Sequence, residues 1–214
     1  MNEPAPALVI DVVSDIVCPW CYVGKRRLEA ALALREDANA AIRWRPFQLD
    51  STIPAEGLDR VAYMTRKFGS LDRIAGIHER LTAIGAQEGI AFDFAAIRRS
   101  PNTLDAHRLI RWADSFDRQG DIVEALFRAF FVEGRDIGDR TVLADMAAEQ
   151  GLDRAAAAAM LQSGTDVEFV AREIEMAHQM GVQGVPFFIF AGKLAVSGAE
   201  AADVLAAAMT QAAQ

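Results

Sequence analysis

The only two cysteines of this 214-residue chain lie close together, in the segment Cys18-Pro19-Trp20-Cys21. The apolar, β-branched run Leu8–Val13 precedes them and predicts a buried strand. The segment 25–35 that follows repeats apolar residues at helical spacing. The two thiols are therefore expected where the C-terminal end of a strand meets the N-terminus of a helix. A C-x-x-C pair in such a place is typical of a redox-active dithiol.

The predicted position at a helix N-terminus changes the chemistry of a thiol. The first helical turn presents unpaired N–H groups and the positive end of the helix dipole, which favour the thiolate. Such sites lower the pKa of cysteine from about 8.5 to roughly 3.5–7.5. Pro19 suits the first helical position because it has no N–H to lose. We infer that Cys18, nearer the helix end, is the attacking nucleophile and that Cys21, one turn on, resolves the mixed disulfide.

The cysteine pair has three other possible interpretations. A zinc site needs four ligands, but the pair supplies two and the three histidines of the chain are scattered. A structural disulfide would close a very short loop and contribute little stability. Two inert, buried thiols remain possible, since free cysteine often behaves as a small hydrophobic residue.

Two neighbours of the cysteines are candidates for supporting roles. Asp15 precedes Cys18 by three positions and could transfer a proton to or from Cys21 if it is buried nearby. The alternative is a solvated loop carboxylate or a helix cap. Trp20 stands between the cysteines and is expected to tune substrate access and the redox potential; a buried aromatic at the edge of the site is the alternative.

Composition excludes several classes of function. With 52% apolar residues the chain can form a full core, as one domain or a domain with an insertion. Its net charge of −8 argues against nucleic acid as a partner. No stretch of about 18 apolar residues predicts a membrane span, and we see no secretory signal. We expect a cytoplasmic protein, in a compartment where small thiols keep most dithiols reduced.

The order of the predicted elements divides the chain into three parts. Residues 1–57 show a strand–helix–strand pattern, whose second strand ends or lies at the sheet edge near Pro46. Residues 58–181 are almost wholly helical in pattern, with glycines at the expected helix ends. Residues 182–214 predict a strand, a second strand and a helix. This order describes an α/β protein with a thioredoxin fold that is interrupted by a large all-helical insertion. We expect a pocket in a groove between the insertion and the thioredoxin part.

The dipeptide Val185-Pro186 leads directly into the predicted third strand, so its peptide bond is a candidate for the cis form. A cis bond would turn the backbone of Val185 toward the dithiol, where its N–H and C=O could pair with an extended substrate chain. A trans proline at the start of a strand is the alternative. The sequence alone leaves the isomer open.

The C-P-W-C segment together with Gly184-Val185-Pro186 resembles the DsbA family of thiol–disulfide oxidoreductases, and most closely its cytoplasmic FrnE-like branch. The resemblance implies a thioredoxin fold with a helical insertion and a cis bond at Val185-Pro186. It also implies disulfide reductase or isomerase activity on a disulfide-containing protein or small thiol. No bound cofactor or metal is expected. Five further segments resemble landmarks of that branch: 14–25, 45–49, 102–109, 131–137 and 196–199.

A neighbouring branch shares this framework, namely the kappa-class glutathione transferases and the 2-hydroxychromene-2-carboxylate isomerases. Its members carry serine at the position of Cys18 and lack the second cysteine. Because this chain has both thiols, dithiol chemistry is the first hypothesis. A glutathione-dependent transferase or isomerase acting on a hydrophobic small molecule is the second, and a non-catalytic binding protein is the third. Glutathione remains a candidate substrate or reductant, and the oligomeric state is not predicted.

Overall fold

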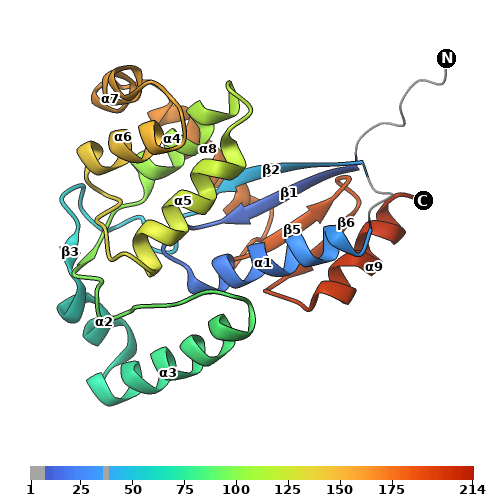
Figure 1. Cartoon of the computed structure of the whole chain (residues 1–214), viewed down its shortest axis with the longest axis horizontal. Helices are drawn as coiled ribbons and strands as arrows, with labels where there is room; N and C mark the ends of the chain where they lie inside the picture. The colour runs from blue at the N-terminus through green and yellow to red at the C-terminus, as the bar shows by residue number, and fades with distance from the viewer. Residues whose placement is uncertain (1–7, 36–38) are drawn as a thin grey trace.

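A four-stranded mixed sheet forms the centre of the protein in the computed structural model, which describes residues 8–35 and 39–214 (Figure 1). The strand order is β2-β1-β5-β6. β1 pairs in parallel with β2 and antiparallel with β5, and β5 forms an antiparallel hairpin with β6. This topology confirms the predicted α/β class. The strands are β1 (Leu8–Ser14), β2 (Ala40–Pro46), β5 (Phe187–Phe190) and β6 (Leu194–Ser197).

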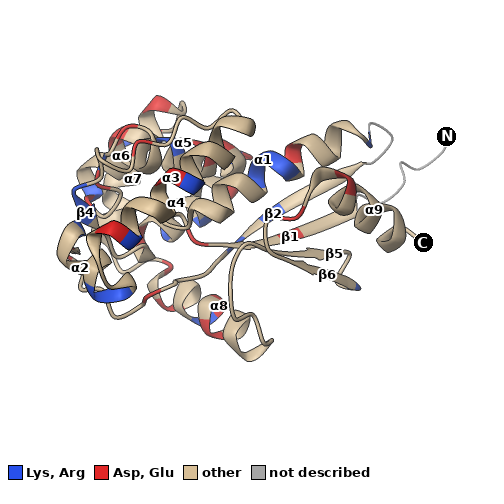
Figure 2. Ribbon diagram, turned by 90° about the horizontal axis from the view of Figure 1, so that it is seen from below, with Lys and Arg blue, Asp and Glu red and all other residues tan. Residues whose placement is uncertain are grey.

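Helices cover both faces of the sheet. α1 (Pro19–Ala33) and α9 (Ala202–Ala212) pack against each other on one face, and α8 (Val167–Gln179) packs against β2 on the other (Figure 2). Because helices cover both faces of the sheet, side chains on both faces of β1 are buried, among them Ile10, Val12 and Val13. This explains why the sequence of β1 is a nearly continuous run of apolar, β-branched residues. α8 falls within the predicted insertion, yet it contributes to the cover of the sheet.

The remaining helices gather at one end of the sheet, where β1 runs into α1 (Figure 1). The expectation of an all-helical insertion needs one correction, because β3 (Leu58–Asp59) and β4 (Arg99–Ser100) form a short antiparallel ladder within it. Two-residue strands carry too little periodicity for sequence to reveal them. The domain boundaries after residues 57 and 181 remain predictions. The helices are α2 (Arg60–Phe68), α3 (Leu71–Gln87), α4 (Leu104–Asp114), α5 (Gln119–Phe131), α6 (Arg140–Glu149) and α7 (Arg154–Gln162).

Contacts between α1 and α5 join the helical insertion to the sheet domain. The ring of Tyr22 stacks on Phe127 with the centroids 4.9 Å apart, and its hydroxyl donates to Glu124. The buried Lys25 reaches the same carboxylate, with Nζ 2.6 Å from Oε2. Apolar stacking and a shared ion pair therefore fix α1 against the insertion from its second turn onward.

None of the helices in the described part of the chain has both the length and the apolar character that crossing a membrane requires.

Candidate active site

The two cysteines lie at the N-terminus of α1, as their sequence context predicts. Cys18 is the N-cap residue and Pro19 the first helical residue. The backbone N–H of Cys18 donates to the carbonyl oxygen of Asp15, and that of Cys21 donates to the carbonyl oxygen of Cys18, each over 3.0 Å. Both side chains are free thiols, with 4% of Cys18 and 1% of Cys21 exposed. The dithiol is thus placed by one turn of backbone at the junction of strand and helix.

The segment before β5 brings a second part of the chain against Cys18. The Val185–Pro186 bond is cis, as the family resemblance implies. The Cys18 Sγ atom lies 3.5 Å from the carbonyl oxygen of Val185, to which the thiol donates. The Cys18 side chain makes no hydrogen bond to the first amides of α1. The structure therefore brings the predicted site residues Val185 and Pro186 against Cys18, which is far from them in the sequence.

Gly24 permits the close packing of α1 against this proline. A Cβ atom at position 24 would lie only 2.7 Å from Cγ of Pro186 and 3.2 Å from the ring of Phe188. Any larger residue would separate the helix that carries the thiols from the proline. Nothing in the local sequence marks Gly24 as a packing residue, because the clash involves a strand distant in the chain.

The inner thiol is shielded from solvent. Burial raises the pKa of Cys21 well above its ordinary value, and the neighbouring Cys18 raises it further. The Ser14 side chain and the Asp15 backbone oppose this shift without cancelling it. Cys21 is therefore a neutral thiol at pH 7, and its use as a nucleophile requires a group that accepts its proton.

Asp15 is buried beside the dithiol, with 1% of its surface exposed, so the alternative of a solvated loop carboxylate is wrong. Its Oδ2 accepts from the N–H of Leu49 over 2.8 Å. Its Oδ1 has no hydrogen bond and lies 3.5 Å from Nε2 of His107. That nitrogen lies 2.9 Å from the carbonyl oxygen of Phe47. The sequence analysis assigns no role to His107, whose only signal is its place in the segment 102–109.

Trp20 is 39% exposed, so the alternative of a buried aromatic is wrong for this residue. It stands between the two cysteines on the first turn of α1 and offers an aromatic surface to solvent. An exposed indole beside a reactive thiol is suited to contact an apolar part of a substrate.

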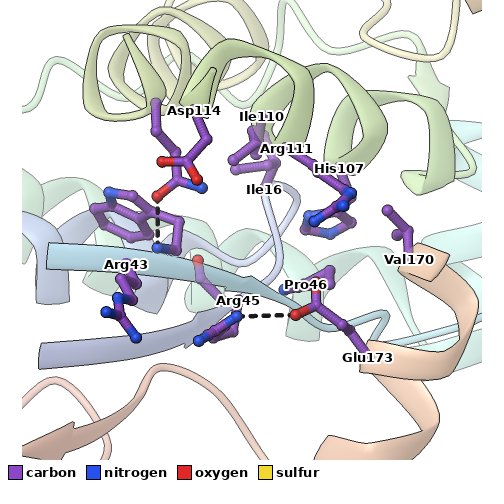
Figure 3. A pocket seen from close by; sticks show the side chains of 13 residues that line it. Ile16, Arg43, Arg45, Pro46, His107, Ile110, Arg111, Asp114, Val170 and Glu173 are labelled. Carbon is purple, nitrogen blue, oxygen red and sulfur yellow. Dashed lines mark hydrogen bonds and ion pairs between the residues drawn. The ribbon is translucent and has the colours of Figure 1, made fainter. Parts of the chain in front are cut away.

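Two cavities flank Asp15 and His107. The first, of about 120 Å³, lies between the turn before α1 and helices α2 and α3, and Asp15 borders it. The second, of about 110 Å³, lies between β2, α4 and α8, and His107 borders it (Figure 3). Arg45 and Glu173, which form an ion pair, both line this second cavity. Within the described residues no group of three or more potential metal ligands gathers in either place.

The sheet topology, the cysteine pair that begins α1 and the adjacent cis-proline define a protein of the thioredoxin-fold class. The chain belongs to the DSBA-like thioredoxin domain family, which matches residues 9–210.

Individual relatives agree with this assignment. A probable DsbA oxidoreductase from Streptomyces coelicolor is 33% identical, with a TM-score of 0.87 over 96% of this chain and 89% of that one. The uncharacterized protein YwbO of Bacillus subtilis is 29% identical over 202 residues, which cover 94% of this chain and 95% of the relative. The cytosolic disulfide reductase DsbM from Pseudomonas aeruginosa, solved with GSH, is 21% identical. It shares the fold, with a TM-score of 0.65 over 97% of this chain and all of that one.

Proposed function

We propose that the protein catalyses thiol–disulfide exchange through Cys18 and Cys21, on a disulfide-containing protein or small thiol. The observation that carries the proposal is the position of Cys18. It lies at the N-terminus of α1, with Cys21 one turn behind it and the carbonyl group of Val185 3.5 Å from its sulfur. Membership of the DSBA-like family supports the same chemistry.

The proposed cycle has two exchange steps. The Cys18 thiolate attacks one sulfur of the substrate disulfide, forms a mixed disulfide and expels the other substrate sulfur as a thiolate, which takes up a proton. Cys21 then loses its proton and attacks the Cys18 sulfur, which releases the second substrate thiol. The substrate gains two electrons and the dithiol is oxidised to a Cys18–Cys21 disulfide. In an isomerase mode the thiol of the substrate resolves the intermediate, and Cys21 serves only to release trapped complexes.

Neighbouring groups have assigned roles in this scheme. Asp15 accepts the proton of Cys21 in the second step, because it is a buried carboxylate with one oxygen free of hydrogen bonds. The backbone of Val185 and the residue Pro186 position an extended substrate segment against Cys18. Trp20 supplies an exposed aromatic contact at the same entrance.

Reduced glutathione is the proposed reductant that regenerates the dithiol, and two molecules of it would supply the two electrons. The name and bound ligand of the DsbM structure support a cytosolic reductase that meets glutathione. We propose the cytoplasm as the place of action for the same reason. A glutathione-dependent transferase or isomerase is the second candidate, favoured by the apolar cavity that borders Pro19.

Turnover of insulin disulfides and of oxidised glutathione by the reduced protein tests the proposal. Cys18→Ser is expected to abolish both activities. Cys21→Ser is expected to accumulate a mixed disulfide on Cys18 and to lose most of the turnover. Retention of most activity in Cys21→Ser, with saturable glutathione binding, would favour the second candidate instead. Full turnover of disulfides in Cys18→Ser would refute the exchange mechanism.

A further inference from the structure

The cavity between α2, α3 and the turn before α1 has mainly apolar walls and one cation with unfilled hydrogen bonds. Its volume of about 120 Å³ is of the same order as the ~150 Å³ in which an engineered apolar cavity binds benzene. The space therefore suits one ring or a short alkyl chain. The apolar lining includes Met64, Phe68, Ile77, Leu81 and Phe94.

The cation is Arg60, and the β3–β4 ladder holds it in place. Arg60 is the first residue of α2, directly after β3, and its backbone N–H donates to the carbonyl oxygen of Arg98 over 3.0 Å. Its Nη1 donates to Oγ of Ser100 over 3.3 Å. The guanidinium lies 5.8 Å from the centre of the Phe130 ring. The charge is thus fixed by the scaffold at the wall of the cavity.

Arg60 lacks a counter-ion in the structure of residues 8–35 and 39–214. Its Nε is buried without a hydrogen-bond partner, and Ser100 is the only side chain that accepts from the guanidinium. Burial lowers the pKa of Arg60 to about 10, and no carboxylate offsets this shift. A desolvated cation without an acid is costly, and the contact with Phe130 offsets only part of that cost. An anion in the cavity would supply the missing partner.

His78 adds a second unfilled group at the same wall. Its imidazole stacks on the ring of Phe94, with the centroids 4.3 Å apart, and its Nε2 is buried without a partner. Burial lowers the pKa of His78, and the nearby charge of Arg60 lowers it further. The ring is therefore neutral at pH 7 and has one N–H to donate.

The other charged groups that line the cavity, within the described residues, make no hydrogen bond or ion pair with Arg60. Asp50 accepts hydrogen bonds from the backbone and side chain of Thr52, which lower its pKa. The charge of Lys67 lowers the pKa of Asp50 further, so the charges of Asp50 and Lys67 offset each other. Lys67 also donates to the hydroxyl of Tyr63 over 3.0 Å. Asp15 borders the cavity at the dithiol and is held by Leu49.

We propose that this cavity binds a small organic monocarboxylate, with the carboxylate on Arg60 and His78 and an apolar ring or chain against Ile77, Leu81 and Phe94. The planar fork of arginine matches the two oxygens of a carboxylate. One carboxylate neutralises one cation, whereas a phosphate dianion would bring a second charge into an apolar space. Binding requires no thiol chemistry, so the proposal goes beyond thiol–disulfide exchange, although the ligand would lie next to Pro19.

Calorimetric titration of the reduced full-length protein with phenylacetate, and with its neutral analogue phenylacetamide, tests the proposal. Phenylacetate is expected to bind one to one, and the amide at least about tenfold more weakly, because the charge-assisted hydrogen bonds are lost. Arg60→Gln is expected to weaken phenylacetate binding by about tenfold or more. Arg80→Gln on α3 is the control, because this arginine is exposed and lies outside the cavity.

Equal affinity for the acid and the amide, or the absence of saturable phenylacetate binding, would overturn the proposal. So would undiminished binding by a folded Arg60→Gln variant. If that variant fails to fold, the comparison of acid and amide on the unaltered protein still tests the proposal. His78→Phe is a second variant, which keeps the stacking on Phe94 but loses the N–H and is expected to weaken phenylacetate binding. Cys18→Ser separates this proposal from the redox function, since it lacks the exchange chemistry but keeps the lining of the cavity.

Discussion

The buried carboxylate of Asp15 lies 3.5 Å from the imidazole of His107, and both side chains are almost fully enclosed. Asp15 borders the cavity beside the dithiol, and His107 borders the second cavity, between β2, α4 and α8. The pair therefore lies between the cavity beside the dithiol and the cavity between β2, α4 and α8. A carboxylate in this place can exchange a proton without direct contact with bulk solvent.

Asp15→Asn is expected to slow the turnover of insulin disulfides on the order of a hundredfold, which is the size of a typical general-base contribution. The amide cannot accept the proton of Cys21, whereas its oxygen can still accept from the N–H of Leu49. The rate of Cys18 alkylation should stay unchanged. The deficit should shrink as the pH rises, because more of Cys21 ionises without a base. Stopped-flow measurement of the second exchange step across pH 6–10 checks this, using a range that spans the ordinary thiol pKa of about 8.5.

Asp11→Asn is the matched control for this prediction, since Asp11 lies on β1, the strand that leads to Asp15, but pairs with Arg45. A pH-independent deficit in Asp15→Asn would indicate a structural role for the carboxylate. An unchanged rate would remove Asp15 from the mechanism.

The two thiols should differ in reactivity in the folded, reduced protein. Because burial raises the pKa of Cys21, iodoacetamide at pH 7 is expected to modify Cys18 and to leave Cys21 unmodified until the chain is unfolded. Mass spectrometry of peptides after a timed reaction distinguishes the two sites, and Cys21→Ser reports on Cys18 alone. Rapid double alkylation of the native protein would contradict this assignment of the inner thiol.

Much of this site could be predicted from sequence because its parts are local. The cysteine pair, the helix that begins at Pro19 and the strand that ends at Pro46 each follow from neighbouring residues. The approach of Val185 to Cys18 and the pairing of Asp15 with His107 depend on how distant segments pack. Local patterns do not encode such packing. The X-Pro bond before a predicted strand marks Val185 as a candidate, and the resemblance to a known family adds that the bond is cis.

Gly24 is another residue whose role only the packing reveals, and it yields a sharp test. Gly24→Ala places a Cβ within 2.7 Å of Pro186, so it is expected to destabilise the protein by about 1–3 kcal/mol and to slow disulfide turnover. Gly76→Ala on α3 meets no atom within 4 Å and should stabilise the protein by about 0.5–1 kcal/mol through helix propensity.

Urea unfolding and insulin reduction by both glycine variants check this prediction. Equal stability changes in the two variants would show that helix propensity alone decides the outcome. A destabilised Gly24→Ala with normal turnover would show that the contact supports the fold but does not position the proline for exchange.

The ion pair that joins α1 to α5 should make stability depend on pH. Burial alone would raise the pKa of Glu124, but hydrogen bonds and charges from Lys25 and Arg26 lower it below its ordinary value of 4.5. The unfolded chain therefore binds this proton more readily than the folded one. The contribution of the carboxylate to stability is full above about pH 4.5 and is lost as the pH falls through the lowered value.

Glu124→Gln is accordingly expected to cost about 1.5–3 kcal/mol at pH 7, the range for hydrogen bonds to charged groups. The reason is that Lys25 is buried and keeps only Glu29 as a charged partner. The difference from the unaltered protein should narrow in acid, where Glu124 itself becomes protonated. Urea unfolding at neutral and acid pH checks this.

Glu168→Gln is the control, since the exposed pair of Glu168 with Arg172 spans 3.9 Å and should contribute almost nothing at either pH. A constant difference across pH would show that Glu124 acts through its shape and not through its charge.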